Sequence, residues 1–270
     1  MVKFLFWNIG KKPLEAIITN LALAHEIDVL ILAECDISVA SMLKMLNRES
    51  VLYEFAHNSQ CPKLAIYTRF PNQFIQPLFE TGRWSIRRLS LPLRTDILVA
   101  AAHLPDKQSH SAESQAYESA ELARSIKSVE EQVGHARTIV IGDFNMDPFE
   151  GGVYAAAGLN AAMTKEIARR ESRTVQGRQY DFFYNPMWGH FGDQTVGPPG
   201  TYYYHRAEHT TLFWHMFDQV LLRPELVDHF RDNELEILTS DGNISFLSAK
   251  GLPDAKIASD HLPLLFSLNL

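Results

Sequence analysis

The feature that most constrains the fold is a β-branched apolar run that ends abruptly in polar residues. Residues 138–141 (Thr-Ile-Val-Ile) are typical of a buried strand, and Gly142 marks its entry into a loop. Alternate side chains of extended backbone share a face, so we expect Asp143 and Asn145 to point one way and Phe144 the other. Such a carboxylate and carboxamide can bind a hard cation or accept and donate hydrogen bonds. The alternative interpretation is a polar turn with local backbone bonds.

Polar residues end other apolar runs of the chain in the same way. Such runs are predicted strands at residues 2–7, 28–33, 96–102 and 262–268, with a further one over residues 214–222. Several polar side chains at strand ends indicate a shared rim, which is where sheet scaffolds commonly carry ligand sites. The residues at these positions are Asn8, Glu34, His103, Asp143, Asp218, Asp260 and His261, with Asn145 just beyond Asp143.

The order of predicted elements favours an α/β protein. Helical spacing of apolar residues after Pro13 predicts a helix between the first two strands, which is a βαβ-like start. Strand candidates without intervening helices then favour antiparallel pairing, and the stripe of apolar residues over 116–133 predicts the longest helix. The remaining candidates are helices at 39–46 and 151–157 and strands at 51–55, 64–68, 73–78, 84–91 and 235–238, while residues 160–213 read as long irregular loops.

Composition is that of a globular protein of one domain spanning residues 1–270. Apolar residues make up 46% and charged residues 21% of the 270, and no repeat or linker is visible. The net charge of -7 counts against tight, sequence-blind duplex binding, although bound metal ions would supply local positive charge. Cys35 and Cys61 are too few for a disulfide scaffold and are expected to be buried free thiols. With no signal peptide and no apolar stretch long enough for a bilayer, we expect a soluble, cytoplasmic protein without membrane partners.

The residue types at the predicted rim suit a hard divalent cation. Carboxylates, amides and imidazoles without a cysteine cluster favour Mg²⁺ or Mn²⁺. Asp218 lies between apolar residues, so its carboxylate needs a partner, for which His261 is our prediction. Each residue also has a simpler interpretation, since Glu34 could be a solvated strand end and His103 a core histidine. The corresponding interpretations are a cap of the turn before the Pro13 helix for Asn8 and a turn residue before Pro148 for Asp147.

Together these residues resemble a known family. The blocks occur in the family's order from Asn8 to His261, and the Gly-Asp-Phe-Asn and Ser-Asp-His blocks are the most specific. The resemblance is to the endonuclease/exonuclease/phosphatase superfamily, which includes deoxyribonuclease I, apurinic endonucleases, inositol-polyphosphate 5-phosphatases, sphingomyelinases and poly(A) deadenylases. The matching blocks are Trp7-Asn8, Ala33-Glu34, Ala102-His103-Leu104, Ile141-Gly142-Asp143-Phe144-Asn145, Phe217-Asp218-Gln219-Val220 and Ser259-Asp260-His261-Leu262-Pro263.

The resemblance implies a four-layer α/β/β/α sandwich of two mixed sheets flanked by helices. It implies that Glu34 is the principal Mg²⁺ (or Mn²⁺) ligand, assisted by Asn8 and Asp260. Asp143 would activate or orient the attacking water, with Asn145 positioning the water or the phosphate. His261, paired with Asp218, would stabilise charge on the phosphorus centre or act as base. His103 would bind the phosphate or assist the leaving group; which groups are general acid and base stays open.

Three functions follow as hypotheses. The first is a divalent-metal-dependent nuclease that cleaves DNA or RNA by water attack. The second is a phosphatase or phosphodiesterase that acts on a small or lipid-derived phosphate ester, and the third is a catalytically idle binding module. Aromatic and arginine residues in the loops could hold single-stranded nucleic acid, or the aromatics could fill a loop core. These residues are Trp188, Tyr202, Tyr203, Tyr204 and Trp214, with Arg169, Arg170, Arg173, Arg178 and Arg206.

Overall fold

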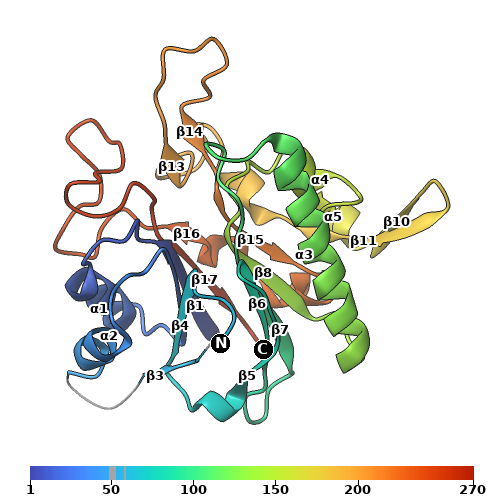
Figure 1. Cartoon of the computed structure of the whole chain (residues 1–270), viewed down its shortest axis with the longest axis horizontal. Helices are drawn as coiled ribbons and strands as arrows, with labels where there is room; N and C mark the ends of the chain where they lie inside the picture. The colour runs from blue at the N-terminus through green and yellow to red at the C-terminus, as the bar shows by residue number, and fades with distance from the viewer. Residues whose placement is uncertain (49–52, 58) are drawn as a thin grey trace.

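Two mixed β-sheets pack face to face, and helices cover their outer surfaces (Figure 1). The structure is a computed structural model that describes residues 1–48, 53–57 and 59–270. The predicted four-layer sandwich is therefore confirmed. No helix in the described ranges has the length and apolar character needed to span a membrane.

The first sheet is built on the predicted βαβ unit. Strands β1 (Val2–Asn8) and β2 (Val29–Ala33) are parallel and are joined by helix α1 (Glu15–Ala24). All other neighbours in this sheet are antiparallel, so the sheet is mixed. Its strand order is β16 (Glu236–Ile237), β17 (Leu264–Leu268), β1, β2, β4 (Leu64–Thr68) and β3 (Glu54–Phe55), and helix α2 (Val39–Leu46) follows β2. Positions 51 and 52 of the strand predicted at 51–55 lie outside the described residues.

The second sheet places β8 (Thr138–Asp143) at its centre. Its neighbours are β7 (Ile97–His103), which is parallel to it, and β15 (Asp218–Leu222), which is antiparallel. Helix α3 (Ala112–Val133) connects β7 to β8 and covers the outer face. The strand order is β5 (Ile75–Glu80), β6 (Trp84–Leu89), β7, β8, β15, β12 (Phe183–Tyr184) and β9 (Ala161–Ala162).

Alternation along the strands separates three apolar layers. In β1, Phe4 and Phe6 face the other sheet and share a cluster with Ile141, whereas Leu5 and Trp7 pack under the helices of the first sheet. A third cluster lies between the second sheet and α3. Since successive strand side chains point to opposite faces, a strand segment buried on both faces is apolar throughout, as residues 4–7 of β1 and 139–141 of β8 are.

The boundaries of several elements differ from those predicted. Helix α3 begins at Ala112 rather than 116, because the Ser111 side chain accepts a hydrogen bond from the backbone N–H of Ser114 and caps the helix. The strand predicted over 214–222 is two strands, β14 (Trp214–His215), which pairs with β13 (Tyr202–Tyr203), and β15. Helix α4 is shorter than predicted (Gly151–Tyr154).

The region predicted as irregular, residues 160–213, contains short regular elements. A hairpin of β10 (Ser172–Val175) and β11 (Arg178–Asp181) projects from the second sheet (Figure 1). The long connection between β13 and β14 forms a separate projection. The other short elements are α5 (Lys165–Ala168) and the 3-10 turns η1 (Asn72–Phe74), η2 (Pro186–His190), η3 (Pro224–His229) and η4 (Asp232–Glu234).

Candidate active site

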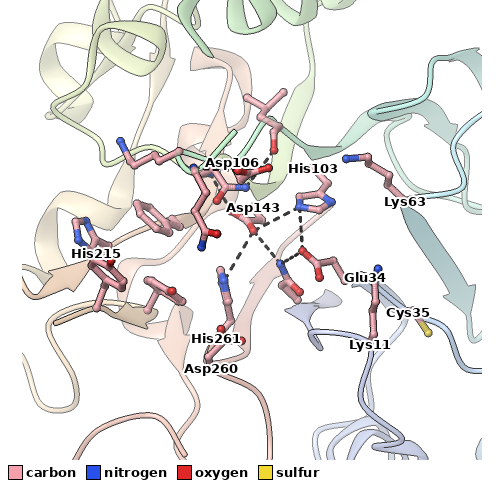
Figure 2. A pocket seen from close by; sticks show the side chains of 18 of the residues that line it. Lys11, Glu34, Cys35, Lys63, His103, Asp106, Asp143, His215, Asp260 and His261 are labelled. Carbon is pink, nitrogen blue, oxygen red and sulfur yellow. Dashed lines mark hydrogen bonds and ion pairs between the residues drawn. The ribbon is translucent and has the colours of Figure 1, made fainter. Parts of the chain in front are cut away.

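A cavity of about 960 Å³ opens where strands of both sheets end. Figure 2 shows Glu34, His103, Asp143 and His261 arranged around it. Asp218 lies directly behind His261 rather than on the cavity wall. The structure thus brings together all eight residues selected from the sequence, of which the following line the cavity: Asn8, Glu34, His103, Asp143, Asn145, Asp260 and His261.

Strand register explains this convergence. Asp143 is the last residue of β8, opposite His103 of β7 on one side and Asp218 of β15 on the other. Asn8 is the last residue of β1 in the other sheet, opposite Ala33, so Glu34 begins the loop beside it. Five segments of the chain therefore deliver polar side chains to one place.

Asp143 is the centre of the polar network and is buried. Its Oδ2 atom accepts a hydrogen bond of 2.9 Å from Nδ2 of Asn8, and its Oδ1 atom accepts one of 2.8 Å from the backbone N–H of Asn145. Nε2 of His103 lies 3.8 Å and Nε2 of His261 4.0 Å from Oδ2. Burial raises the pKa of Asp143, against the opposing effect of His261.

His261 is held as a cation by two carboxylates. Its Nδ1 atom lies 2.8 Å from Oδ2 of Asp218, which confirms the predicted pair. Burial alone would lower the pKa of His261, but Asp218 and Asp143 outweigh it and raise this pKa to about 10. Trp7 fixes the backbone, because its indole Nε1–H donates to the carbonyl of His261 at 2.8 Å.

His103 is placed to act as a neutral imidazole. Burial lowers its pKa, although the charge of Asp143 partly opposes that effect. Nε2 of His103 lies 3.5 Å from Oε1 of Glu34, and its Nδ1 atom is buried without a hydrogen-bond partner among the described residues. Because His103 faces two carboxylates on a cavity wall, it is not the core histidine of our alternative interpretation.

Left-handed backbone positions cluster at this site. Glu34 has φ +48°, Asn145 φ +52° and Lys11 φ +60°. Each conformation is strained for a residue with a Cβ atom, and such strain collects at functional sites. Because of its turn, Asn145 also donates from Nδ2 to the carbonyl of Leu104, while Phe144 packs into the core beneath, as predicted.

Asn8 acts on carboxylates rather than as a helix cap. Its Nδ2 atom faces Asp143 and lies 3.4 Å from Oε1 of Glu34, whereas its Oδ1 atom accepts from the backbone N–H of Gly10. Leu14 precedes α1, so Asn8 does not cap that helix, but its bond to Gly10 does cap the turn before it, as the alternative interpretation stated. As placed, Asn8 orients two carboxylates, and ligation of a cation through its oxygen requires the amide to rotate.

The charges of the site fit a bound cation. Three carboxylates, those of Glu34, Asp143 and Asp218, face one imidazolium, that of His261, so the site carries excess negative charge. Hard oxygen donors in this number suit Mg²⁺ or Mn²⁺. Donor atoms of Asp143, Asp218 and His261 lie within 4.8 Å of one another, but the His261–Asp218 hydrogen bond already uses two of them. Glu34, with its side chain 35% exposed toward the cavity, is the better placed ligand.

Asp147 is the turn residue before Pro148 that the sequence predicted, since its carbonyl accepts a hydrogen bond of 2.9 Å from the backbone N–H of Glu150, but its side chain has a further role. It is 1% exposed, its Oδ2 atom lies 2.8 Å from Nδ1 of His215, and its Oδ1 atom accepts from the backbone N–H of Met216. The Asp-Pro sequence is typical of a turn, and nothing in the pattern revealed that β14 lies across it. His215 lines the cavity and was also missed.

The loop residues proposed for nucleic acid divide into two groups. Tyr202, Tyr204 and Arg206 line the cavity. Tyr202 stacks on Phe217, with ring centroids 5.2 Å apart. The remaining aromatics and arginines do not line it, and these are Trp188, Tyr203, Trp214, Arg169, Arg170, Arg173 and Arg178. Lys11 and Lys63 line the cavity near Glu34 and were not selected from the sequence.

The fold and the site define an α/β sandwich with a polar, acidic centre where both sheets end. A model of the Endonuclease/Exonuclease/phosphatase family matches residues 5–261, and the chain belongs to this family, whose class is phosphoester hydrolase. No match was found among curated proteins.

Solved structures with the same fold cover nearly the whole chain. A family protein from Leptotrichia buccalis has a TM-score of 0.59 at 14% identity, covering 100% of both chains. The 3′ phosphatase NExo from Neisseria, bound to a product DNA hairpin, has a TM-score of 0.58 at 13% sequence identity, and the match covers 100% of both chains. TDP2 from D. rerio, complexed with single-strand DNA product, has a TM-score of 0.57 at 14% sequence identity. The match covers 100% of this chain and 99% of the TDP2 chain. At these identities the likeness establishes the fold.

Proposed function

We propose that residues 1–270 form one catalytic domain of a divalent-metal-dependent nuclease that cleaves phosphodiester bonds in DNA or RNA. The observation that carries the proposal is the convergence of Glu34, Asp143 and His261, from separate segments, on one cavity. The DNA products bound in the NExo and TDP2 structures support this substrate class. The free thiols of Cys35 and Cys61 fit the cytoplasmic location that we also propose.

The proposed roles follow from charge and position. Mg²⁺ held by Glu34, with Asn8 and Asp260 close by, would polarise the phosphate and neutralise its charge. Asp143 accepts two hydrogen bonds that fix its carboxylate, and its raised pKa suits a group that takes a proton from water.

The two histidines have different charges and so different roles. His261 is an imidazolium that faces the cavity and stabilises the negative charge that develops on the phosphoryl oxygens. His103, with its lowered pKa, contributes a neutral imidazole that can donate a hydrogen bond to the phosphate or assist the leaving group. Asn145 holds the loop after β8 and presents its amide at the same cavity.

A second candidate is removal of a terminal phosphate, as expected of a 3′ phosphatase such as NExo. The observation that favours it is the pair Lys11 and Lys63, which line the cavity beside Glu34 and form no ion pair within the described ranges. Two cations on the cavity wall of a chain of net charge -7 suit a phosphate dianion.

One panel of substrates tests both functions. Purified protein with Mg²⁺ is offered single-stranded DNA and RNA, duplex DNA, an oligonucleotide with a 3′ phosphate, and inositol and sugar phosphates. Cleavage of internal bonds that EDTA abolishes supports the nuclease, and release of inorganic phosphate alone supports the second candidate. Absence of turnover with Mg²⁺ and with Mn²⁺ would refute both and leave the binding module.

A further inference from the structure

The projecting hairpin of β10 and β11 has one face that carries two arginines. Residues directly opposite each other in an antiparallel pair share a face, and so do alternate residues of each strand. The register of the hairpin therefore places four side chains together, and these are Arg173, Val175, Arg178 and Tyr180. We call them the arginine face. The acidic residue of the hairpin, Asp181, belongs to the other face and pairs with Lys127 at 3.1 Å.

No carboxylate of the described ranges compensates the two arginines of this face. Most other arginines of these ranges pair with an acidic side chain, as Arg169 does with Asp228. Arg178 is exposed and has neither a hydrogen bond nor an ion pair to a described residue. Arg173 donates one hydrogen bond of 3.0 Å to the carbonyl of Tyr154, and its Nε atom has no partner in that part of the chain. Both guanidinium groups are therefore available to an anion.

Helix α4 connects the arginine face to the catalytic cavity. Tyr154 is the last residue of α4, and its carbonyl accepts the hydrogen bond from Arg173. The backbone N–H of Tyr154 donates to the carbonyl of Glu150 at 3.1 Å. The Glu150 side chain pairs at 2.6 Å with Lys107, which lines the cavity. A surface path as long as one short helix therefore leads from the cavity rim to the hairpin (Figure 1).

Two exposed aromatic side chains lie along this path. Phe149 directly precedes Glu150 and is 44% exposed, and Tyr154 is 51% exposed. Phe149 packs against Trp188 and Phe191, with ring centroids 6.3 and 6.1 Å away, so its position is supported from the side. Exposed aromatic rings bind unpaired bases by stacking, which the bases of a duplex cannot offer because they stack on one another. Aromatic rings followed by uncompensated cations are typical of surfaces that bind single-stranded nucleic acid.

We propose that an unpaired strand of the substrate runs from the cavity over these two aromatic side chains to the hairpin, where Arg173 and Arg178 bind two of its phosphates. The proposal rests on the nuclease function and names its substrate class, a nucleic acid with several unpaired nucleotides beside the scissile bond. Charge complementarity selects this occupant, because uncompensated cations on a chain of net charge -7 attract a polyanion. The two arginines lie two rows apart in the hairpin, about 7 Å, which neighbouring phosphates of an extended strand can match.

The test uses the whole chain and labelled single-stranded oligonucleotides of about 4 to about 24 nucleotides. Fluorescence anisotropy in EDTA measures binding without metal-dependent cleavage of the probe, and kcat/KM is measured with Mg²⁺. We expect the affinity and kcat/KM of wild type to rise about tenfold or more from the shortest to the longest strand, because only a long strand reaches the hairpin. Absence of binding, or a Kd and kcat/KM that do not depend on length, would overturn the proposal.

The salt dependence of binding assigns the effect to the arginine face. Each phosphate contact on a single strand contributes about 0.7 to the slope of log Kd against log salt concentration. The double variant Arg173→Gln/Arg178→Gln should therefore lower this slope by about 1.4 on the longest strand, and Arg178→Gln by about half as much. Arg124→Gln, which removes an exposed arginine paired with Glu121, is the matched control and should equal wild type. If the double variant does not fold, Arg178→Gln decides, and a slope equal to that of wild type would overturn the proposal.

Tyr154→Ala tests the path between the cavity and the hairpin. Loss of one stacked base should weaken binding of the longest strand about tenfold and leave its salt slope unchanged, because no charge is removed. An affinity equal to that of wild type would overturn the aromatic part of the path.

The outcomes separate this proposal from the nuclease function. Cleavage by wild type at a rate independent of strand length would overturn the proposal while the nuclease stands. Binding that depends on Arg178, without cleavage of any oligonucleotide, would refute the nuclease function and keep the contact. Equal affinity for duplex DNA of the same length, with the same loss in Arg178→Gln, would overturn the preference for a single strand. A change of oligomeric state in Arg178→Gln at unchanged DNA affinity would show that a second copy occupies the arginine face instead.

Discussion

Nδ2 of Asn8 lies 2.9 Å from Oδ2 of Asp143, although 135 positions separate the two residues in the chain. Asn8 ends β1 of the first sheet and Asp143 ends β8 of the second. The bond therefore joins the two halves of the sandwich at the proposed catalytic carboxylate. Any shift of one sheet relative to the other would therefore move Asp143 relative to Glu34.

Replacement of the central groups should abolish turnover without unfolding the protein. Asp143→Asn and His261→Gln are each expected to lose at least about 10² in kcat, the scale of acid–base or charge-stabilising groups. Steady-state rates at saturating Mg²⁺ measure this, with circular dichroism as the folding control. Near wild-type kcat in either variant would refute its role.

The proposed metal ligand should be recognised by its Mg²⁺ dependence. Glu34→Gln keeps the size of the side chain but removes its charge, so the Mg²⁺ concentration for half-maximal activity should rise about tenfold or more. A Mg²⁺ titration of activity and direct calorimetric binding provide two measurements. Asp36→Asn, an exposed carboxylate on the same cavity, is the matched control, and an equal shift in both variants would contradict a specific role for Glu34.

The raised pKa of His261 should make stability depend on pH. The folded-state pKa of about 10 lies above the usual value of 6.5, so the contribution to the free energy of unfolding is complete below pH 6.5 and is lost as pH rises toward 10. The slope is at most about 1.4 kcal/mol per pH unit. Urea unfolding of wild type and Asp218→Asn from pH 6 to 10 should show a difference that shrinks with pH. A constant difference would show that Asp218 does not act through this proton.

Loss of a buried ion pair should lower the unfolding free energy more than loss of an exposed one. Arg223 contacts both oxygens of Glu130 at 2.9 and 3.0 Å, and both side chains are buried. Arg223→Met leaves Glu130 unpaired and should cost about 3–5 kcal/mol in unfolding free energy. Arg169→Ala, which removes an exposed pair with Asp228, should cost about 1 kcal/mol or less. Similar losses in both variants would contradict this ranking.

Position 142 should not tolerate any residue with a side chain. A Cβ atom there would lie 1.9 Å from the carbonyl oxygen of Ala102 on β7, so Gly142→Ala must displace the strand that carries His103. We expect loss of activity together with a lower melting temperature. Gly82→Ala, where a Cβ atom meets nothing within 4 Å, is the control and should be unchanged in both measurements. Wild-type activity and melting temperature in the Gly142→Ala variant would show that β7 and β8 can separate locally.

The sequence alone determined the layers and most of the site. Apolar runs that end in Asn8, Glu34, His103 and Asp143 predicted the strands and a common rim, because alternation and strand ends are local properties of the chain. The partner of Asp218 was also predictable, since a carboxylate inside an apolar strand must be neutralised nearby.

Tertiary structure decided what no local pattern records. Asp147 is a turn residue, as Asp-Pro predicted, but no local pattern indicated that its carboxylate would pair with His215 of β14. The charges of His103 and His261 were equally hidden, since identical side chains acquire opposite pKa shifts from their burial and neighbouring carboxylates. Sequence fixes which groups are available, whereas distance and desolvation, which arise only when distant strands meet, set their charge and their partners.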